Sequence, residues 1–209
     1  NKTFRRNFEM YSGHGLSEVY DPTHPLSFEH SVFTSNAVSQ DAPSHIQDAW
    51  RLGLHVSAIA ASDDHRSRPG LPHYGLAAVR AKSLTRNDIF QGLHDRQTYA
   101  TTGSKIILHF TVNGTPMGES SPITDKADIT LRAHGTGIIA YLEILRYQPG
   151  DKAFKVLKRY TPGTLDFQTT WSDPAPTQGS IYYTRIQQQR PVHGRMAMAW
   201  SSPVWLQNK

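Results

Sequence analysis

Cysteine is absent from the 209 residues of this sequence. Its absence excludes disulfide bonds and thiolate metal ligands, and it leaves the compartment of the protein open. Long apolar runs are missing as well, because no segment approaches the roughly 20 residues that a membrane-spanning helix needs. The Gly-x-Ser-x-Gly turn of serine hydrolases, the P-loop and the Rossmann dinucleotide fingerprint do not occur either. None of these function classes is therefore indicated.

Positively charged residues are only slightly more numerous than negatively charged ones. There are 22 Lys and Arg residues against 17 Asp and Glu residues, which gives a net charge of +5. The basic residues are scattered and form no continuous stripe, so nucleic-acid binding is not indicated, whereas small anionic substrates are favoured. A content of 37% hydrophobic and 19% charged residues is typical of a globular protein with one large domain or two modest ones.

The first half of the chain alternates apolar runs with helical patterns. Residues 56–61 and 75–81 are short apolar runs, which predict buried strands of the parallel type. Helices are predicted over 44–53 and, behind a threonine cap, over 86–95. Residues 19–43 are rich in Pro, Ser and Asn and predict an irregular excursion. Alternation of strand and helix is typical of an α/β domain.

The pattern changes after Gly103. A strand at 106–112 leads into an Asn-Gly hairpin turn. Further short strands, separated by turns rich in Gly, Pro and Asp, are predicted at 127–133, 138–147, 154–160, 165–171, 180–187 and 196–206. Such a series predicts an antiparallel β-sandwich of roughly seven strands. The sequence therefore predicts an α/β domain over residues 1–103 and a β-sandwich over residues 104–209.

A candidate metal site follows one of the apolar runs. Asp63 and His65 lie two positions apart, so in an extended backbone both side chains leave the same face. A carboxylate oxygen beside an imidazole nitrogen suits Zn, Mn or Fe. Glu9 ends an earlier apparent strand, and His14 and Glu18 follow it in one Gly-rich loop. If the two strands are neighbours in one sheet, these side chains converge on a single edge.

Simpler explanations exist for the same residues. The Ser-Asp-Asp run at 62–64 is ordinary turn chemistry, and Glu9 could be a charge at a strand end. Arg66 is a candidate for binding an anionic group, because a guanidinium fork matches phosphate and carboxylate, with surface solvation as the alternative. His30 and His45 could also approach the predicted edge.

Several segments, in the same order along the chain, resemble one known group of proteins. They are residues 8–18 (FEMYSGHGLSE), 61–65 (ASDDH), 75–79 (GLAAV), 84–86 (LTR), 96–103 (RQTYATTG) and 199–205 (AWSSPVW). Together they cover most of the chain. They resemble the PHP (polymerase and histidinol phosphatase) superfamily, in particular its DUF3604 branch, which is related to carbaryl-hydrolase-type metallohydrolases.

The resemblance implies the C-terminal part of a distorted (β/α)7 barrel with two or three divalent metals at its strand ends. Asp63 and His65 match the closing Asp-x-His motif of the superfamily, and Glu9 matches its bridging glutamate. His14 is carried over as a further ligand, and Glu18 as a residue that supports the ligands or replaces one of them. Related proteins are often exported, so a periplasmic or secreted location is expected, with the cytoplasm as the alternative.

One motif of the superfamily is missing. The chain contains no His-x-His, and about 100 residues of α/β structure cannot close such a barrel. We therefore expect this chain to be the C-terminal portion of a longer protein. The N-terminal portion, in the same chain or in a separate one, would then be a partner that supplies the missing motif.

The expected function is metal-dependent hydrolysis. Metals at the four predicted ligands would lower the pKa of a bound water to about 7, and the resulting hydroxide would attack a phosphoester, carboxyl ester or carbamate. A metal and Arg66 would stabilise the developing oxyanion, with Glu18 beside the ligands. The expected partner is a small anionic or ester substrate and not nucleic acid. A homo-oligomer is an open alternative.

Two other functions fit the sequence. A non-catalytic binding or assembly subunit would keep a vestigial or structural metal site, and the missing His-x-His favours it unless a partner supplies that motif. A carbohydrate-binding surface would use the aromatic residues of the predicted sandwich, although core packing explains them better. These residues are Trp171, Tyr182, Tyr183, Trp200 and Trp205.

Overall fold

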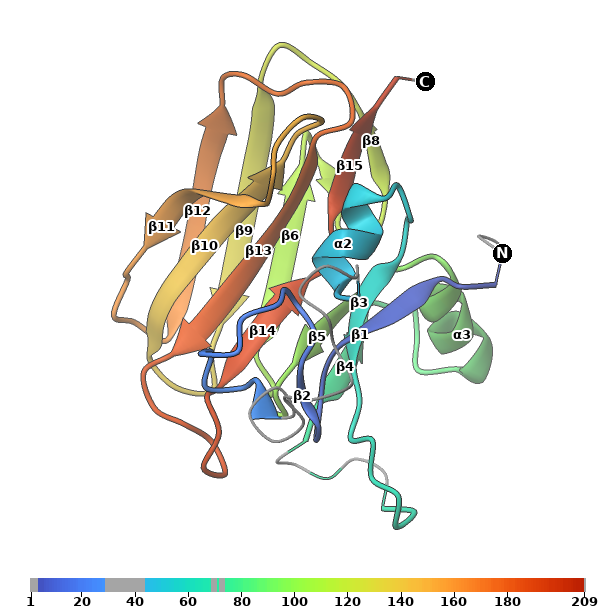
Figure 1. Ribbon diagram of the computed structural model, residues 1–209, viewed down its shortest axis with the longest axis vertical. Helices are drawn as coiled ribbons and strands as arrows, with labels where there is room; N and C mark the ends of the chain where they lie inside the picture. Colours follow the sequence, from blue (N-terminus) through green and yellow to red (C-terminus); the bar gives the residue numbers. More distant parts are fainter. Residues whose placement is uncertain (1–3, 29–43, 69–70, 72–73, 209) are drawn as a thin grey trace.

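The structure is a computed structural model that describes residues 4–28, 44–68, 71 and 74–208. Within this part the chain forms three β-sheets and two helices (Figure 1). The excursion predicted over 19–43 lies outside the described residues from residue 29 onward, as does His30. Neither described helix is long and apolar enough to cross a membrane.

The smallest sheet has the strand order β2-β1-β3. Its members are β1 (Asn7–Ser12), β2 (Gly15–Leu16) and β3 (Ser57–Ala60). β1 is parallel to β3 and antiparallel to β2, and a register shift interrupts the parallel pairing between Glu9 and Tyr11. Helix α2 (Ile46–Arg51) connects the two parallel strands and contributes buried Ile46 and Trp50 to the core. Since parallel strands share a direction, β1 and β3 end at the same edge.

The largest sheet has eight strands in the order β11-β10-β13-β14-β5-β4, with β15 pairing β13 and β8. Its members are β4 (Leu76–Val79), β5 (Thr98–Thr101), β8 (Ser120–Pro122), β10 (Ile139–Tyr147), β11 (Lys155–Tyr160), β13 (Ile181–Gln188), β14 (Met198–Ser201) and β15 (Val204–Gln207). Helix α3 (Arg86–His94) connects β4 to β5, and Thr85 caps it by accepting a hydrogen bond from the N–H of Asp88. This sheet takes strands from both sides of residue 103.

The third sheet has the order β12-β9-β6-β7. Its members are β6 (Ile107–Val112), β7 (Thr115–Pro116), β9 (Ala127–His134) and β12 (Asp166–Asp173). Along β9 each second residue is buried, and the residues between them are exposed. This alternation places one face of the sheet on the core and the other in solvent.

The eight-stranded sheet forms the middle of three layers. Its strands send alternate side chains to opposite faces. Tyr182 and Ile186 pack with residues of the four-stranded sheet. Tyr183 and Trp200 pack with Tyr11 and other residues of the three-stranded sheet and α2. Tyr182, Tyr183, Trp200 and Trp205 are at most 2% exposed. Core packing therefore accounts for these four aromatic residues.

The predicted fold class, a partial (β/α)7 barrel followed by a β-sandwich, is wrong. The strands lie in open sheets. β4, predicted as a buried strand of the parallel type, pairs antiparallel with β5, and both strands join the eight-stranded sheet. β4 is also not a buried strand, since none of its four residues is fully buried. The physical reason is that an apolar run followed by a helix specifies neither the direction of the next strand nor its neighbour.

Candidate metal centre

The two loops that follow β1 and β3 lie side by side. Both chains leave the three-stranded sheet at the same edge, because the strands are parallel neighbours. The N–H of Gly13, after β1, donates a hydrogen bond to the carbonyl oxygen of Ser62, after β3, at 3.2 Å. His14 and Asp63 are the next residues in the two loops. The bond therefore holds them close together.

Asp63 lies between two imidazole rings. Its Oδ2 atom is 3.2 Å from Nε2 of His14, and its Oδ1 atom is 3.2 Å from Nε2 of His65. The two rings are nearly perpendicular, with an interplanar angle of 85° and centroids 5.9 Å apart. One ligand atom from each residue lies within 4.8 Å of the other two. The structure thus brings together three of the four predicted ligands, which we call the His–Asp–His cluster.

The backbone around the His–Asp–His cluster is constrained, although its side chains are open to solvent. These side chains are 45%, 43% and 80% exposed, in chain order. Asp63 has a φ of +47°, a left-handed conformation that costs a non-glycine residue about 1 kcal/mol. At Gly13 a Cβ atom would lie 2.7 Å from the Tyr74 ring and 2.8 Å from the Ser62 carbonyl oxygen. The loops are therefore fixed by backbone contacts, and the donor atoms face solvent.

Glu9, the fourth predicted ligand, lies beside the cluster and is not a member of it. Burial raises the pKa of its carboxyl group above the ordinary value of 4.5. A hydrogen bond with Ser12 lowers the pKa, the charge of Asp63 raises it, and His14 lowers it. Because charges act on Glu9 from two members of the cluster, its carboxylate is within electrostatic range of the donor atoms.

Glu18 is held elsewhere, in the core. Its side chain is 1% exposed. Oε1 accepts hydrogen bonds from the Tyr183 hydroxyl at 2.5 Å and from Arg185 at 3.0 Å, and Oε2 accepts one from the Trp200 indole at 3.0 Å. Burial raises the pKa of the Tyr183 hydroxyl well above its ordinary value, and Glu18 raises it further, so this tyrosine donates as a neutral group. The structure does not bring Glu18 to the cluster.

The predicted anion-binding residue, Arg66, lies exposed in the turn that follows His65. The paired arginine in this turn is Arg68, whose guanidinium donates to both carboxylate oxygens of Asp64 at 2.9 and 3.2 Å. His45, the other histidine considered, is buried at the N-terminus of α2 and contacts Asp48.

Arg195 also lies near these loops and is not among the candidate residues that the sequence predicts. Nη1 of Arg195 donates a hydrogen bond to the Tyr11 hydroxyl at 2.8 Å. Its guanidinium carbon lies 4.6 Å from the ring centroid of Phe28 and 5.1 Å from that of Tyr74. No local pattern could have found this group, because Arg195 follows Tyr11 by 184 positions.

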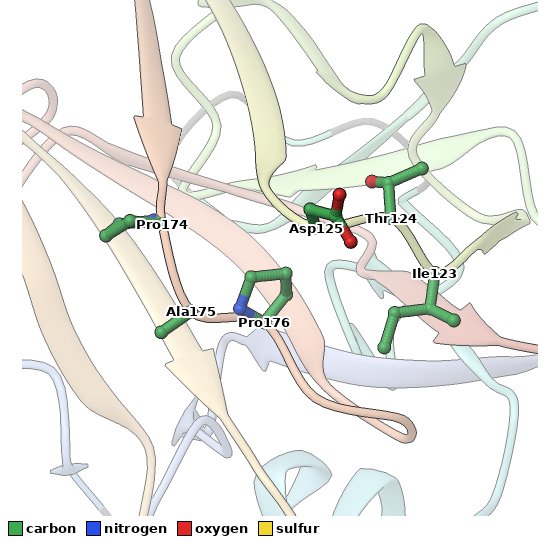
Figure 2. Close-up of a pocket in the computed structure, with 6 residues that line it drawn as sticks. All are labelled: Ile123, Thr124, Asp125, Pro174, Ala175 and Pro176. Carbon is green, nitrogen blue, oxygen red and sulfur yellow. The ribbon is translucent and has the colours of Figure 1, made fainter.

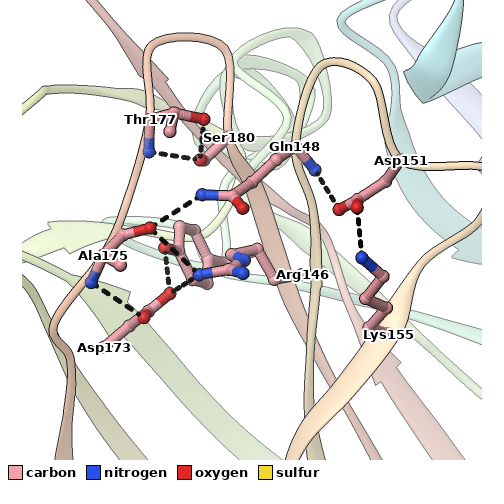
Figure 3. Close-up of polar contacts among 9 residues, drawn as sticks. Arg146, Gln148, Asp151, Lys155, Asp173, Ala175, Thr177 and Ser180 are labelled. Atoms are coloured by element: carbon pink, nitrogen blue, oxygen red, sulfur yellow. Dashed lines mark hydrogen bonds and ion pairs between the residues drawn. The ribbon is translucent and has the colours of Figure 1, made fainter.

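A shallow hollow and a buried ion pair lie between loops that connect strands of the two larger sheets. Figure 2 shows an open hollow whose six lining residues include a single ionisable one, Asp125. Next to one of its walls, Arg146 forms an ion pair with Asp173 and donates to the carbonyl oxygen of Ala175 at 3.2 Å (Figure 3). The Tyr182 hydroxyl also donates to Asp173, at 2.7 Å. These contacts fix the loop that follows β12 and account for the buried charges there.

The fold and the site define a class of protein: strand-rich, with an open His–Asp–His cluster at the ends of two parallel strands. Residues 27–136 match the family described as "Protein of unknown function (DUF3604)". The chain belongs to this family. The match confirms the expected resemblance to DUF3604. It does not test the expected membership of the wider PHP superfamily.

Relatives of the chain occur in chlamydiae. The chain is 26% identical over 232 residues to an uncharacterized protein of Chlamydia trachomatis serovar D, and 29% identical over 228 residues to one of Chlamydia muridarum. A third uncharacterized protein, from Chlamydia pneumoniae, is 28% identical over 223 residues. Each comparison covers 97% of this chain and 34% of the relative. The chain thus spans about a third of the length of the curated relatives it matches.

Proposed function

We propose that the chain binds a divalent transition-metal ion through the His–Asp–His cluster. One observation carries the proposal: two imidazole nitrogens and a carboxylate oxygen lie within 4.8 Å of one another at the ends of adjacent strands. The donor set fits the group, because imidazole and carboxylate together suit Zn, Mn or Fe. Three protein donors with solvent on the remaining side are also the arrangement of catalytic rather than structural zinc sites.

We further propose that the site serves hydrolysis of a phosphoester, carboxyl ester or carbamate, as in metallohydrolases of the PHP superfamily. When bound, the cation supplies Lewis acidity and lowers the pKa of water at the site to about 7. Asp63 holds both imidazoles with their Nε2 atoms directed toward its carboxylate, so the donors are oriented in advance. Glu9, with its raised pKa, is suited to accept a proton near the cluster.

The proposed hydrolase needs residues beyond this chain. Three donors are few for a site of two or three metals, and Glu9 adds only one more carboxylate beside them. The matched relatives are about three times as long as the chain, so they contain further residues that could include a His-x-His motif. The exposure of the cluster, 80% at His65, favours a second candidate, a binding or assembly subunit whose metal site no longer supports catalysis.

Metal titration tests the binding proposal. Zn²⁺ and Mn²⁺ affinities would be measured by calorimetry for the protein and for its Asp63→Asn and His65→Ala variants. The matched controls are Asp166→Asn and His134→Ala, because that exposed pair is also a histidine against an aspartate, at 2.5 Å. Among the described residues this pair belongs to no group of three donors. We expect each cluster variant to lose more than about tenfold in affinity, and each control to keep it. Equal affinities throughout would refute the proposal.

Hydrolysis is tested separately. The metal-loaded protein, alone and with the N-terminal portion of a full-length relative, would be assayed on aryl phosphate, aryl ester and aryl carbamate substrates. The hydrolase proposal predicts turnover that Asp63→Asn abolishes. Metal binding without turnover in either preparation would favour the binding or assembly subunit.

A further inference from the structure

Arg195 is fixed at the base of a tight hairpin between β13 and β14. Val192 and Arg195 exchange two backbone hydrogen bonds, of 2.8 and 3.1 Å. The two residues between them, His193 and Gly194, have φ values of +51° and +77°, which is the conformation of a type I′ turn. The backbone that carries the Arg195 side chain is therefore well defined.

The side chain of Arg195 is oriented from three directions. The rings of Phe28 and Tyr74 contact the guanidinium group at 4.6 and 5.1 Å, and the Tyr11 hydroxyl accepts one hydrogen bond at 2.8 Å. Aromatic contacts hold a guanidinium plane in place without using its N–H donors. Of the five N–H donors, one is used in a hydrogen bond within the described residues, which leaves four for other acceptors.

Tyr74 connects this arginine to the candidate metal centre. Its ring lies against Gly13, where a Cβ atom would come within 2.7 Å of two ring carbons. Gly13 precedes His14, and its hydrogen bond to Ser62 places it beside the residue that precedes Asp63. The guanidinium group of Arg195 lies over the same ring, 5.1 Å from its centroid. The guanidinium group is therefore separated from the backbone of the His–Asp–His cluster by the width of one aromatic ring.

Within the part of the chain that the structure describes, no carboxylate neutralises the charge of Arg195. Among the residues that the structure describes, no Asp or Glu forms an ion pair with it. Two of the other partly buried arginines differ in this respect, since Arg146 pairs with Asp173, and Arg185 pairs with Glu18 and Glu143. A third, Arg96, donates to the carbonyl oxygen of Gly118 at 3.0 Å. A half-buried, oriented guanidinium with free donors is a ready site for a carboxylate or phosphate group, which accepts two parallel hydrogen bonds.

We propose that Arg195 forms an anion-binding subsite beside the His–Asp–His cluster, which takes a phosphate or carboxylate group of a small substrate. The inference rests on the proposed function for the position of the bond that is hydrolysed. It adds the substrate class, which is a molecule that carries an anionic group in addition to that bond. Arg195, held from three directions, takes the role that the sequence suggests for exposed Arg66.

Phosphate binding to metal-free protein tests the subsite. Inorganic phosphate would be titrated into protein treated with a chelator, and its affinity would be followed by NMR for the Arg195→Gln, Arg195→Lys and Arg66→Gln variants. We expect Arg195→Gln to weaken phosphate binding by at least about tenfold, the loss of a bidentate charge-assisted contact. Arg195→Lys keeps the charge without the planar fork, so we expect an intermediate loss. Arg66→Gln is the matched control and should stay within twofold.

The main competing explanation is that Arg195 only clamps the hairpin onto β1. In that case Arg195→Gln would lower the unfolding temperature while phosphate affinity stayed the same, and this result would overturn the proposal. No phosphate binding by the unmodified protein would overturn it as well. If Arg195→Gln fails to fold, Arg195→Lys alone tests the proposal. A weakened phosphate affinity of Arg195→Lys would then support the subsite, and an unchanged affinity would overturn it. Because no metal is present, these outcomes are independent of the Asp63→Asn titration, which tests the metal proposal.

Discussion

The N–H of Gly13 donates a hydrogen bond to the carbonyl oxygen of Ser62 across a distance of 3.2 Å. This single backbone contact joins two loops that are about fifty positions apart in the chain and carry His14 and Asp63. It depends on the parallel pairing of β1 with β3, which delivers both loops to one edge. The candidate metal centre is therefore a product of strand pairing and not of a local motif.

Gly13→Ala should disturb this junction. The new Cβ atom would lie within 3 Å of both the Tyr74 ring and the Ser62 carbonyl oxygen, so one of the loops must move. We expect a loss of about 1–3 kcal/mol in the free energy of unfolding, together with weaker Zn²⁺ binding. Urea unfolding and zinc titration measure the two effects. Gly137→Ala is the control, because its Cβ atom would meet Gln188 only at ordinary contact distance, 3.8 Å; equal behaviour of both variants would contradict the account.

Glu18→Gln should destabilise the core without affecting the metal centre. It removes the charge that faces Arg185 inside the protein, although Glu143 still accepts a hydrogen bond from that arginine at 2.6 Å. Breaking a buried ion pair on one side typically costs about 3 kcal/mol. Denaturant unfolding should show a loss of this order, while zinc affinity stays unchanged.

The control for Glu18→Gln is Lys126→Gln, which breaks an exposed pair with Asp128 at 3.1 Å. Such a pair contributes less than about 1 kcal/mol. Reduced zinc affinity in Glu18→Gln would show that Glu18 acts at the metal centre, as the sequence suggests.

Glu9 should make the stability of metal-free protein depend on pH. Its pKa is raised above 4.5 by burial, so the folded protein binds this proton more tightly than the unfolded chain does. Stability from this group is therefore fully present at pH values below 4.5 and is lost as the pH rises through the raised, folded-state pKa. Glu9→Gln should consequently gain stability relative to the unmodified protein between pH 4 and pH 7.

Urea unfolding at several pH values, with a chelator present, measures this difference. Glu119→Gln serves as the control, since Glu119 is exposed in the turn before β8. A constant difference between Glu9→Gln and the unmodified protein across the pH range would contradict the burial of the carboxyl group.

The candidate ligands of the site could be predicted from the sequence, because each follows a recognisable local pattern, whereas their meeting depends on the pairing of β1 with β3. The positions of Asp63 and His65 after an apolar run, and of His14 after a strand and a glycine, are local information. The extended backbone expected between Asp63 and His65 is wrong, because Asp63 has a φ of +47° and β3 ends at Ala60. Once β1 and β3 pair, these residues meet. Likewise, the helix behind Thr85 forms where its cap predicts it, from Arg86 to His94.

The remainder depends on partners that are remote in the chain. The hydrogen-bond donors to Glu18 come from residues 165 to 182 positions later, and nothing near Glu18 indicates that it is buried. The direction of β4 and β5 is set by β14, which pairs with β5 from about 100 positions away. Arg195 reaches Tyr11 only because the eight-stranded sheet carries its hairpin to the end of β1. Long-range pairing of this kind leaves no periodic signal in the sequence.

Histidine side-chain NMR during a zinc titration tests the central claim most directly, because it observes the proposed ligand atoms themselves. Both imidazoles face Asp63 with Nε2. We therefore predict that Zn²⁺ shifts the Nε2 resonances of His14 and His65 together, at one equivalent, and leaves those of His109 and His134 unchanged. Resonances of His14 and His65 that stay in place while zinc binds, or shifts confined to other histidines, would contradict the assignment of the His–Asp–His cluster as a metal centre.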